Sequence, residues 1–463
     1  MEDRIENDAL GSCRVPGDVY WGIHTQRALG NFVLTSRRVP VSLVHAFGLV
    51  KNACCLANTE LGFLEGKRGG AISRACTDVA NGCLDNQFPL DALQGGAGTS
   101  TNMNINEVVA NRAIELMGGR RGDYGLVSPL NHVNLHQSTN DTYPTAVKVA
   151  AIAELRRLSD ALAGLQGAFQ KKEKAFANIA KIGRTELVDA VPITLGKEFS
   201  AFADAFARDR WRTFKCEERI RTVNLGGTAV GTGLTAPRSY FFLVTDILRE
   251  LTGFGLNGGE NVVDQTANAD AFVEVSGILK ACAATMIKVA NDLRLLQFKQ
   301  EITLPAVQAG SSVMPGKVNP VILESAIQAG MLVKASDSIV TDCAASGSLQ
   351  INEFMPLLAH ALLESITTLR NAAASLAGHV AGINANADIC QQGLHASITS
   401  ITAFLPLLGY ERASELVKEF ESRQGGDDFF TFLCEKLGTD TVTEMLTPEN
   451  LVSLGYRPHA ENT

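Results

Sequence analysis

The sequence is poor in aromatic side chains and has no excess of positive charge. Aromatic residues make up 6% of the 463 residues and hydrophobic residues 46%, so the core must consist mainly of Ala, Val, Leu and Ile. This composition suits close packing of helices better than a β-sandwich. The formal net charge is −8, and no Lys/Arg run could follow a phosphate backbone, so nucleic acid is not an expected partner.

Cysteine pairs and long apolar runs are also missing. The ten cysteines are scattered, with no CxxC pair and no Cys/His cluster at metal-ligand spacing, which predicts reduced thiols and no metal site. The N-terminus MEDRIENDALG is acidic and has no apolar signal segment. No uninterrupted apolar run approaches the roughly 20 residues that span a bilayer, so we expect a cytoplasmic protein without a membrane partner.

Five long segments carry apolar residues at helical spacing, namely 145–179, 195–224, 270–298, 320–345 and 353–381. A 30-residue helix is about 45 Å long, which is too long for one small domain to bury, so such helices usually pack side by side. We therefore predict a mainly α fold with three domains: an N-terminal helical domain at 1–137, a central five-helix bundle at 138–382 and a small C-terminal helical domain at 383–463. Uncovered apolar faces on this bundle predict an oligomer.

The most informative stretch is GSSVMPGKVNPVILE, which begins at Gly310 and precedes a predicted helix. It places Ser311, Lys317 and Asn319 on one loop. Such a loop can close over a small anionic substrate, expel water, and present both a proton acceptor and a positive charge. We interpret it as a lid.

Three other polar loops precede or interrupt the predicted helices. Thr99 follows three glycines, and this loop is either a helix cap with a tight turn or a set of small donors. The run Ser138–Asn140 fits a cap or a carboxylate site about equally well. Thr185 and Glu186 lie in a charged connection that is typical of a solvated turn unless other segments converge there. The glycines of 224–234 indicate turns and a structural role.

These loops belong to a longer series of motifs that resembles the aspartase/fumarase superfamily, in the family's order and over nearly the whole chain. The motifs are GDVYWGIHTQRALGNF, GGAGTSTNMNINEVVANRAIELMG, HQSTNDTYPTA, GRTELVDAVPITLGKEF, NLGGTAVGTGL and AGSSVMPGKVNP. Within the family, STND, GIHTQRA and DAVPITLGKEF are more similar to the aspartate ammonia-lyases than to the fumarases.

The resemblance implies a homotetramer with a central 20-helix core, in which loops from three subunits form each active site. It implies reversible deamination of L-aspartate to fumarate and ammonia through an enediolate-type elimination. No organic cofactor is implied, although a divalent cation such as Mg²⁺ stimulates some relatives. Ser311 matches the general base. The other matched positions bind substrate: Thr99, Ser138 and Thr139 at one carboxylate, Asn140 and Thr185 at the amino group and the other end of the substrate, and Lys317 and Asn319 at a carboxylate. Glu186 does not match the family pattern, and its charge could bind the substrate ammonium or indicate a different amine.

Two departures from the family pattern bear on the substrate. Glu186 stands where fumarases carry a histidine and aspartases often carry glutamine or histidine, and this argues against a fumarase. The segment NDLRLLQFKQEITLPAVQAGSS lacks the SGP-rich insertion that usually precedes the lid. The alternatives are a class II fumarate hydratase, a lyase of a related amino-dicarboxylate and, more remotely, a non-catalytic structural homologue.

Overall fold

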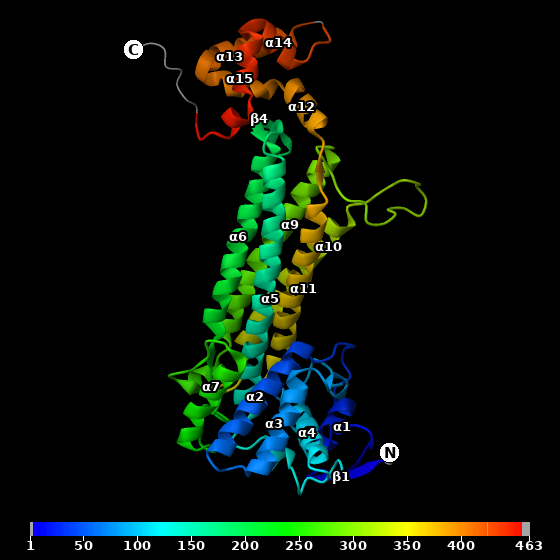
Figure 1. Ribbon diagram of the computed structural model, residues 1–463, viewed down its shortest axis with the longest axis vertical. Helices are drawn as coiled ribbons and strands as arrows, with labels where there is room; N and C mark the ends of the chain where they lie inside the picture. The colour runs from blue at the N-terminus through cyan, green and yellow to red at the C-terminus, as the bar shows by residue number, and fades with distance from the viewer. Residues whose placement is uncertain (1–2, 424, 456–463) are drawn as a thin grey trace. The chain divides into compact units, whose positions relative to one another are not determined.

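The computed structural model describes residues 3–423 and 425–455, and it is mainly α-helical (Figure 1). The chain divides into two compact units, each built from three stretches of sequence. Unit 1 comprises Met1–Ser159, Trp211–Ala283 and Gly330–Arg370, and unit 2 comprises Asp160–Arg210, Ala284–Ala329 and Asn371–Thr463. The division into domains at 137 and 382 stays a prediction.

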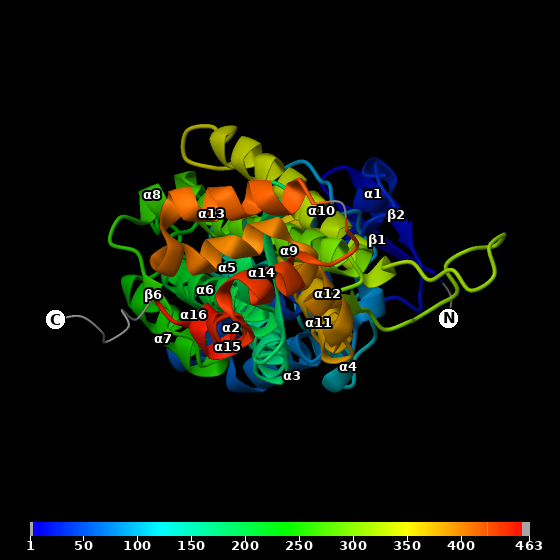
Figure 2. The ribbon, with the colours of Figure 1, turned by 90° about the horizontal axis from the view of Figure 1, so that it is seen from above.

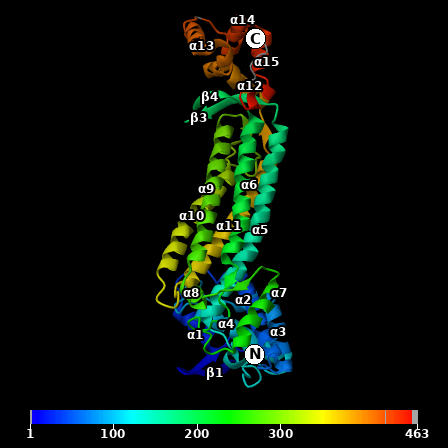
Figure 3. The ribbon, with the colours of Figure 1, turned by 90° about the vertical axis from the view of Figure 1, so that its left-hand side faces the viewer.

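The five predicted long segments are helices, as Figure 3 also shows. Their bounds are α5 (Thr139–Ala175), α6 (Leu195–Ile220), α9 (Asp270–Phe298), α10 (Val321–Ala345) and α11 (Met355–Ala381). Each contributes residues to both units. Small residues such as Ala and Gly are frequent along them, which lets neighbouring helices approach closely. The mainly α class predicted from the sequence is confirmed.

Unit 1 also contains shorter elements around the buried helix α2 (Val41–Glu60), which packs against α3 and α7. The others are β1 (Arg4–Asp8), β2 (Gly11–Val15), α1 (Ile23–Asn31), α3 (Gly66–Ala80), η1 (Asp85–Gln87), α4 (Thr99–Leu116), the π-helical turn η2 (Pro129–Val133), β5 (Thr222–Val223), α7 (Arg238–Thr252), β6 (Asn257–Gly258) and α8 (Val262–Ala267). The antiparallel pair β1–β2 and the parallel pair β5–β6 were not predicted from the sequence.

Helix α2 alone, among the described residues, is long and apolar enough to cross a membrane by length and composition. However, 72% of its apolar window is buried inside the protein. It also carries Lys51 and Asn58, which are both buried and hydrogen-bonded within unit 1. These contacts are those of a core helix, and the polar residues interrupt its apolar run.

Unit 2 combines two small antiparallel sheets with a cluster of C-terminal helices, seen from above in Figure 2. Its shorter elements are β3 (Ala180–Thr185), β4 (Val188–Thr194), β7 (Ile302–Thr303), β8 (Asn384–Ala385), α12 (Ala387–Ala396), η3 (Ile398–Phe404), α13 (Leu405–Glu421), α14 (Phe429–Leu437), α15 (Thr439–Met445) and α16 (Pro448–Val452). Phe404, Phe429 and Phe432 are fully buried in the core of this cluster. The cluster therefore has a hydrophobic core of its own.

The start of α5 differs from the prediction, which placed it just after Pro144. The helix begins at Thr139 and contains Pro144. Proline cannot donate to the carbonyl four residues earlier, which normally disfavours a helix interior. Here the freed carbonyl of Asn140 accepts a hydrogen bond from the Asn224 side chain at 3.0 Å. A distant residue therefore satisfies the group that the proline leaves open.

Candidate active site

The first turn of α5 carries three of the predicted substrate-binding residues. Ser138 caps the helix, because its Oγ accepts the N–H of Asn140 at 3.2 Å while its own N–H donates to Oδ1 of Asp141 at 3.0 Å. Thr139 is buried, and its Oγ1 accepts a hydrogen bond from Asn102 at 3.1 Å. The Thr139 hydroxyl therefore keeps its own proton available for another acceptor.

The glycine-containing loop at 224–234 holds this turn from one side. The N–H groups of Gly226 and Thr228 donate to Oδ2 of the buried Asp141 at 3.2 and 2.9 Å. The amide of Asn140 donates to the carbonyl of Ala229 at 2.7 Å. Burial raises the pKa of Asp141 to about 6, although these backbone donors oppose the shift. The structural role predicted for this loop thus takes a specific form, since its backbone immobilises Asn140 and Asp141.

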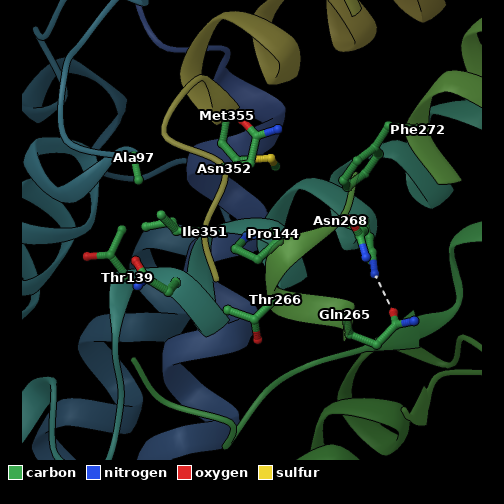
Figure 4. Close-up of a pocket in the computed structure, with 12 residues that line it drawn as sticks. Ala97, Thr139, Pro144, Gln265, Thr266, Asn268, Phe272, Ile351, Asn352 and Met355 are labelled. Carbon is green, nitrogen blue, oxygen red and sulfur yellow. Dashed lines mark hydrogen bonds between the residues drawn. The ribbon is translucent and has the colours of Figure 1, made fainter. Parts of the chain in front are cut away.

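Thr139 and Asn140 border a pocket in unit 1, shown in Figure 4. Its walls come from the start of α5, the segment that joins α8 to α9, and the start of α11. The lining residues are Ala97, Thr139, Asn140, Pro144, Lys148, Gln265, Thr266, Asn268, Phe272, Ile351, Asn352 and Met355. These lining side chains include amides, hydroxyls and one lysine but no carboxylate, so the pocket suits an anionic ligand.

Lys148 is the cation of this pocket and was not predicted. Its side chain is 4% exposed, and its Nζ donates to the carbonyl of Thr222 at 2.6 Å and to Oε1 of Gln265 at 3.4 Å. Burial lowers its pKa to about 8, against the opposing influence of Asp270 and Asp264. The sequence signal was a single lysine inside the apolar stretch YPTAVKVAAIA, where a charge is unusual unless the protein uses it.

Thr99 lies at the first position of α4, next to the strained turn that leads into that helix. Gly96, Ala97 and Gly98 all have positive φ, at 77°, 57° and 88°. A Cβ on Gly98 would lie 2.2 Å from the Tyr143 ring, so only glycine fits there. The Thr99 side chain is exposed, and its hydroxyl donates to the carbonyl of Gly96 at 2.8 Å. The glycines therefore form a tight turn before the helix, which is one of the two interpretations that the sequence allowed for this loop.

Thr185 and Glu186 lie at the tip of the β3–β4 hairpin in unit 2. Glu186 and Leu187 form its two-residue turn, with φ of 52° and 66°. Two positive φ values indicate a type I′ turn, which usually contains Asn or Gly, so the backbone is strained at both residues. Thr185, Glu186 and Leu187 are all exposed. The hairpin thus presents a carboxylate and a hydroxyl at a fixed exposed tip.

The base of this hairpin is anchored by buried charges. Lys181, on β3, pairs with Oε2 of Glu301 at 2.7 Å and with Glu198 at 2.8 Å. Arg184 pairs with Oε1 of Glu301 at 2.7 Å and with Asp189 of β4 at 3.2 Å. Lys181 and Glu301 are nearly inaccessible to solvent, so loss of one partner would leave a buried charge unpaired. This network fixes the strand that ends at Thr185.

The lid loop belongs to unit 2 as well, and its two ends are fastened together. The N–H of Gly310 donates to the carbonyl of Lys317 at 2.8 Å, and the Asn319 amide donates to the carbonyl of Gly310 at 2.6 Å. Within the loop, Oγ of Ser311 accepts the N–H groups of Val313 and Met314 at 3.1 and 2.8 Å. Two such donors stabilise negative charge on the oxygen, which the predicted base requires.

Lys317 is exposed and has no ion-pair partner within residues 3–423 and 425–455. The predicted residues therefore form groups within each unit. Unit 1 holds Thr99, Ser138, Thr139 and Asn140, and unit 2 holds the hairpin pair Thr185 and Glu186 and the lid residues Ser311, Lys317 and Asn319. Sequence reasoning missed most of the polar residues behind these groups, which are Lys51, Asn134, Asp141, Lys148, Lys181 and Glu301.

Comparison with known proteins agrees with these motifs. A family model described as "Lyase" matches residues 11–334. Aspartate ammonia-lyase of Bacillus sp is 42% identical over 461 residues, covering 98% of both chains. The crystal structure of fumarate lyase:delta crystallin from Brucella melitensis bound to cobalt is 44% identical, with a TM-score of 0.93 over 98% of this chain and 100% of that one.

A recombinant class II fumarase from Schistosoma mansoni is also similar in structure, at 31% identity. Its TM-score is 0.90, over 97% of this chain and 99% of that chain. The helical fold is thus shared by ammonia-lyases and fumarases, and the site loops must distinguish the two reactions. The chain belongs to the lyase family that contains them, the aspartase/fumarase superfamily.

Proposed function

We propose that the protein is an aspartate ammonia-lyase, a carbon–nitrogen lyase that converts L-aspartate reversibly to fumarate and ammonia. The chemical difficulty is the weak acidity of the proton on Cβ, which lies next to a carboxylate. Removal of this proton creates an enediolate-type dianion that needs preorganised donors. The main support is the lid, where Ser311 Oγ accepts two backbone N–H groups.

In the proposed mechanism, Ser311 Oγ takes the Cβ proton, and the electron pair of that bond moves into the adjacent carboxylate. The pair then returns to form the carbon–carbon double bond as the carbon–nitrogen bond breaks and ammonia leaves. Ser138 and Thr139 donate to the carboxylate that becomes the enediolate, and Thr99 joins them when substrate binding turns its hydroxyl away from the Gly96 carbonyl. Lys317 holds the other carboxylate by charge, and Asn319 shapes the base of the lid through its bond to Gly310.

We propose that Asn140, Thr185 and Glu186 act at the amino group. The Asn140 amide already donates to Ala229, so its Oδ1 remains as the acceptor for an ammonium. Glu186 adds a carboxylate at an exposed hairpin tip. A carboxylate attracts the cationic ammonium group of an amino acid more strongly than it attracts the neutral water molecule of the fumarase reaction. This charge favours an ammonia-lyase over a fumarase.

The same observation favours a second candidate, a lyase for a related amino-dicarboxylate with a different amine. Glu186→Gln keeps the size of the side chain and removes its charge. We expect it to raise the KM for ammonium at least tenfold, in line with the roughly 1.5–3 kcal/mol of a hydrogen bond to a charged group. The measurement is the KM for ammonium in the reverse reaction. An unchanged KM would show that Glu186 only shapes the turn.

No step of this mechanism uses a metal or an organic cofactor. Within the described part of the chain, no group of three or more His, Cys, Asp or Glu side chains could hold a metal ion. Cobalt belongs to the Brucella melitensis structure. We propose that Mg²⁺ stimulates the enzyme without joining the reaction, which titration of Mg²⁺ and of a chelator into the assay would test.

We further propose a homotetramer with a 20-helix core. Long helices expose large apolar side chains, including Trp211 and Phe214 on α6 and Met331 and Leu332 on α10. Trp211 is 64% exposed and Phe214 61% exposed, which is costly for a helix that faces water. Burial of these faces against other copies would explain them, and light scattering on the purified protein would measure the assembly.

The first experiment is to incubate the protein with fumarate, with and without ammonium, and to identify the product by chromatography. Aspartate formed only with ammonium supports the proposal. Malate formed without ammonium would identify a fumarase, and product formed only with another amine would identify the second candidate. Absence of reaction with every amine and with water would point to a non-catalytic homologue.

A further inference from the structure

Lys51 is a fully buried cation that the proposed mechanism does not yet use. It lies in the middle of α2, its side chain is 0% exposed, and no carboxylate within the described residues lies at ion-pair distance from it. Its Nζ donates instead to two neutral side-chain oxygens, Oδ1 of Asn134 at 3.0 Å and Oε1 of Gln137 at 2.8 Å. An unpaired buried charge costs several kcal/mol, so it calls for a reason.

Both acceptors lie in the short segment that leads into the predicted substrate loop. Gln137 directly precedes Ser138, and its amide also donates to the carbonyl of Val133 at 2.9 Å. The Asn134 amide donates to the carbonyl of Gln137 at 3.3 Å. Lys51 therefore binds both ends of the segment 134–137, which lies immediately before the N-terminal cap of α5.

Asn134 relays this arrangement to Thr139. Its Oδ1 accepts hydrogen bonds from Lys51, from Asn106 at 3.0 Å and from Asn102 at 3.2 Å. The second proton of the Asn102 amide goes to Oγ1 of Thr139 at 3.1 Å. Because Thr139 accepts this bond, its hydroxyl proton must point elsewhere, and Thr139 borders the pocket. The orientation of one donor thus depends on a chain of bonds that starts at Lys51.

We propose that Lys51 is a positioning residue for the elimination, which sets the Thr139 hydroxyl as a donor to the substrate through Asn134 and Asn102. This inference rests on the proposed function, since it assigns Thr139 to a substrate carboxylate. A purely structural residue would not need the charge, because well-packed apolar side chains of similar volume often replace buried charges without loss of stability. The charge is needed if its task is to hold amide oxygens in fixed directions.

A double-mutant cycle tests the proposal. Lys51→Met keeps the length of the side chain and removes the charge, and Thr139→Val removes the donor. We expect each to lower kcat/KM about 100-fold, about tenfold through KM because the donor already binds the substrate carboxylate, and about tenfold through kcat because it stabilises charge that develops in the transition state. The double variant should be no more than about threefold worse than the worse single variant, since both changes remove one interaction.

Asn102→Ala offers a second route, because it leaves Lys51 in place and breaks the link to Thr139. If Lys51→Met does not fold, the double-mutant cycle of Asn102→Ala with Thr139→Val tests whether these two residues act through one interaction. Ser365→Ala is the control, as it removes a buried hydroxyl of unit 1 that bonds the Ala361 carbonyl of its own helix α11, and it should leave kcat/KM unchanged. The proposal would be overturned if the fold-loss in kcat/KM of the double variant equalled the product of the two single losses, because the two residues would then act independently. Near-normal activity of Asn102→Ala would overturn it as well.

Binding of succinate, a dicarboxylate that cannot eliminate, separates this inference from the proposed function. Calorimetry on the wild-type enzyme should show succinate binding, and Asn102→Ala should weaken it about tenfold, as expected for loss of one bond to a charged group. A wild-type protein without lyase activity would contradict the proposed function. An active wild type whose succinate affinity is unchanged in Asn102→Ala would contradict the relay alone.

Discussion

At the residue scale, the chemistry depends on whether a serine can serve as a base. A hydroxyl is a poor base at its ordinary pKa, and the two N–H groups on Ser311 Oγ are what would favour its ionised form. Ser311→Ala should therefore lower kcat by 10²- to 10⁴-fold, the range of general base catalysis. The assembly and the melting temperature should stay unchanged, because this oxygen lies on an exposed loop. Activity within tenfold of wild type would exclude Ser311 as the base.

Ser312→Ala is the matched control, since it removes a neighbouring exposed hydroxyl from the same loop. No hydrogen bond within the described residues depends on the Ser312 side chain, so its removal should leave turnover near wild type. Equal losses in the two variants would indicate a general disturbance of the loop.

Lys51 also has a consequence for stability as pH changes. Burial lowers its pKa to about 8, whereas the facing groups Cys54, Asp141 and Cys76 oppose this shift. The unfolded chain, with an ordinary lysine pKa of about 10.4, therefore binds more protons between these values, and the stability contribution rises with pH in that window. Over the whole window, from about pH 8 to about pH 10.4, the contribution of Lys51 to the free energy of unfolding rises by about 3 kcal/mol.

The measurement compares wild type with Lys51→Met in thermal melts at several pH values from neutral to pH 10. The melting temperature of wild type should rise relative to the variant above pH 8. A constant difference between the two proteins across this range would show that Lys51 does not titrate there. Activity should move in the opposite direction, because deprotonation weakens the hold of Lys51 on Asn134 and Gln137.

At the element scale, the lid depends on a glycine at its base. A Cβ on Gly310 would lie 2.5 Å from the Lys317 carbonyl and 2.7 Å from the Asn319 nitrogen, which are both backbone atoms. Gly310→Ala must therefore open the two bonds that fasten the loop. We expect kcat/KM to fall at least tenfold because Ser311 and Lys317 lose their relative placement.

Gly393→Ala is the control for this change, because a Cβ there meets nothing within 4 Å and the residue lies inside α12. It should keep full activity and raise stability by about 0.5–1 kcal/mol, as alanine favours a helix. Full activity in Gly310→Ala would show that the lid tolerates an open base. Steady-state kinetics and melting temperatures on the two variants suffice.

Sequence periodicity predicted the long helices well but not their first turns. The segment 270–298 matches α9 at both ends because its apolar spacing is a local property. The start of α5 was wrong, because the carbonyl freed by Pro144 is satisfied by Asn224, a contact that no local pattern contains. The β3–β4 hairpin was missed for a similar reason, since Glu-Leu is an unusual type I′ turn held by buried charges.

The site shows the same limit. Loop motifs identified the residues expected to touch substrate, but residues behind them, such as Lys51 and Lys148, lie in apolar helical stretches. Their roles arise from hydrogen bonds between segments far apart in sequence, as between Lys51 and Asn134. A charge within an apolar helix was the one local sign, and it marked both Lys51 and Lys148.

At the scale of the whole molecule, the proposed tetramer makes a prediction about mixtures of inactive variants. Suppose that one chain contributes Thr139 and another chain contributes Ser311 to the same site. A Thr139→Val chain then still supplies Ser311, and a Ser311→Ala chain still supplies Thr139. Hybrid tetramers then contain some sites with both residues intact. In an equal mixture, each of the two residues is intact at a given site with a chance of about one half, so about a quarter of the sites have both. Unfolding and refolding the two variants together should therefore restore about a quarter of wild-type activity.

The mixture must be compared with each variant refolded alone, which should stay nearly inactive, and with the two variants mixed without unfolding. A mixture that recovers activity only after joint refolding supports shared sites. If one chain supplied both residues, no hybrid could contain a complete site, and joint refolding would leave the activity at the level of the single variants. The test thus separates a tetramer built for catalysis from one that only covers the apolar faces at Trp211 and Phe214.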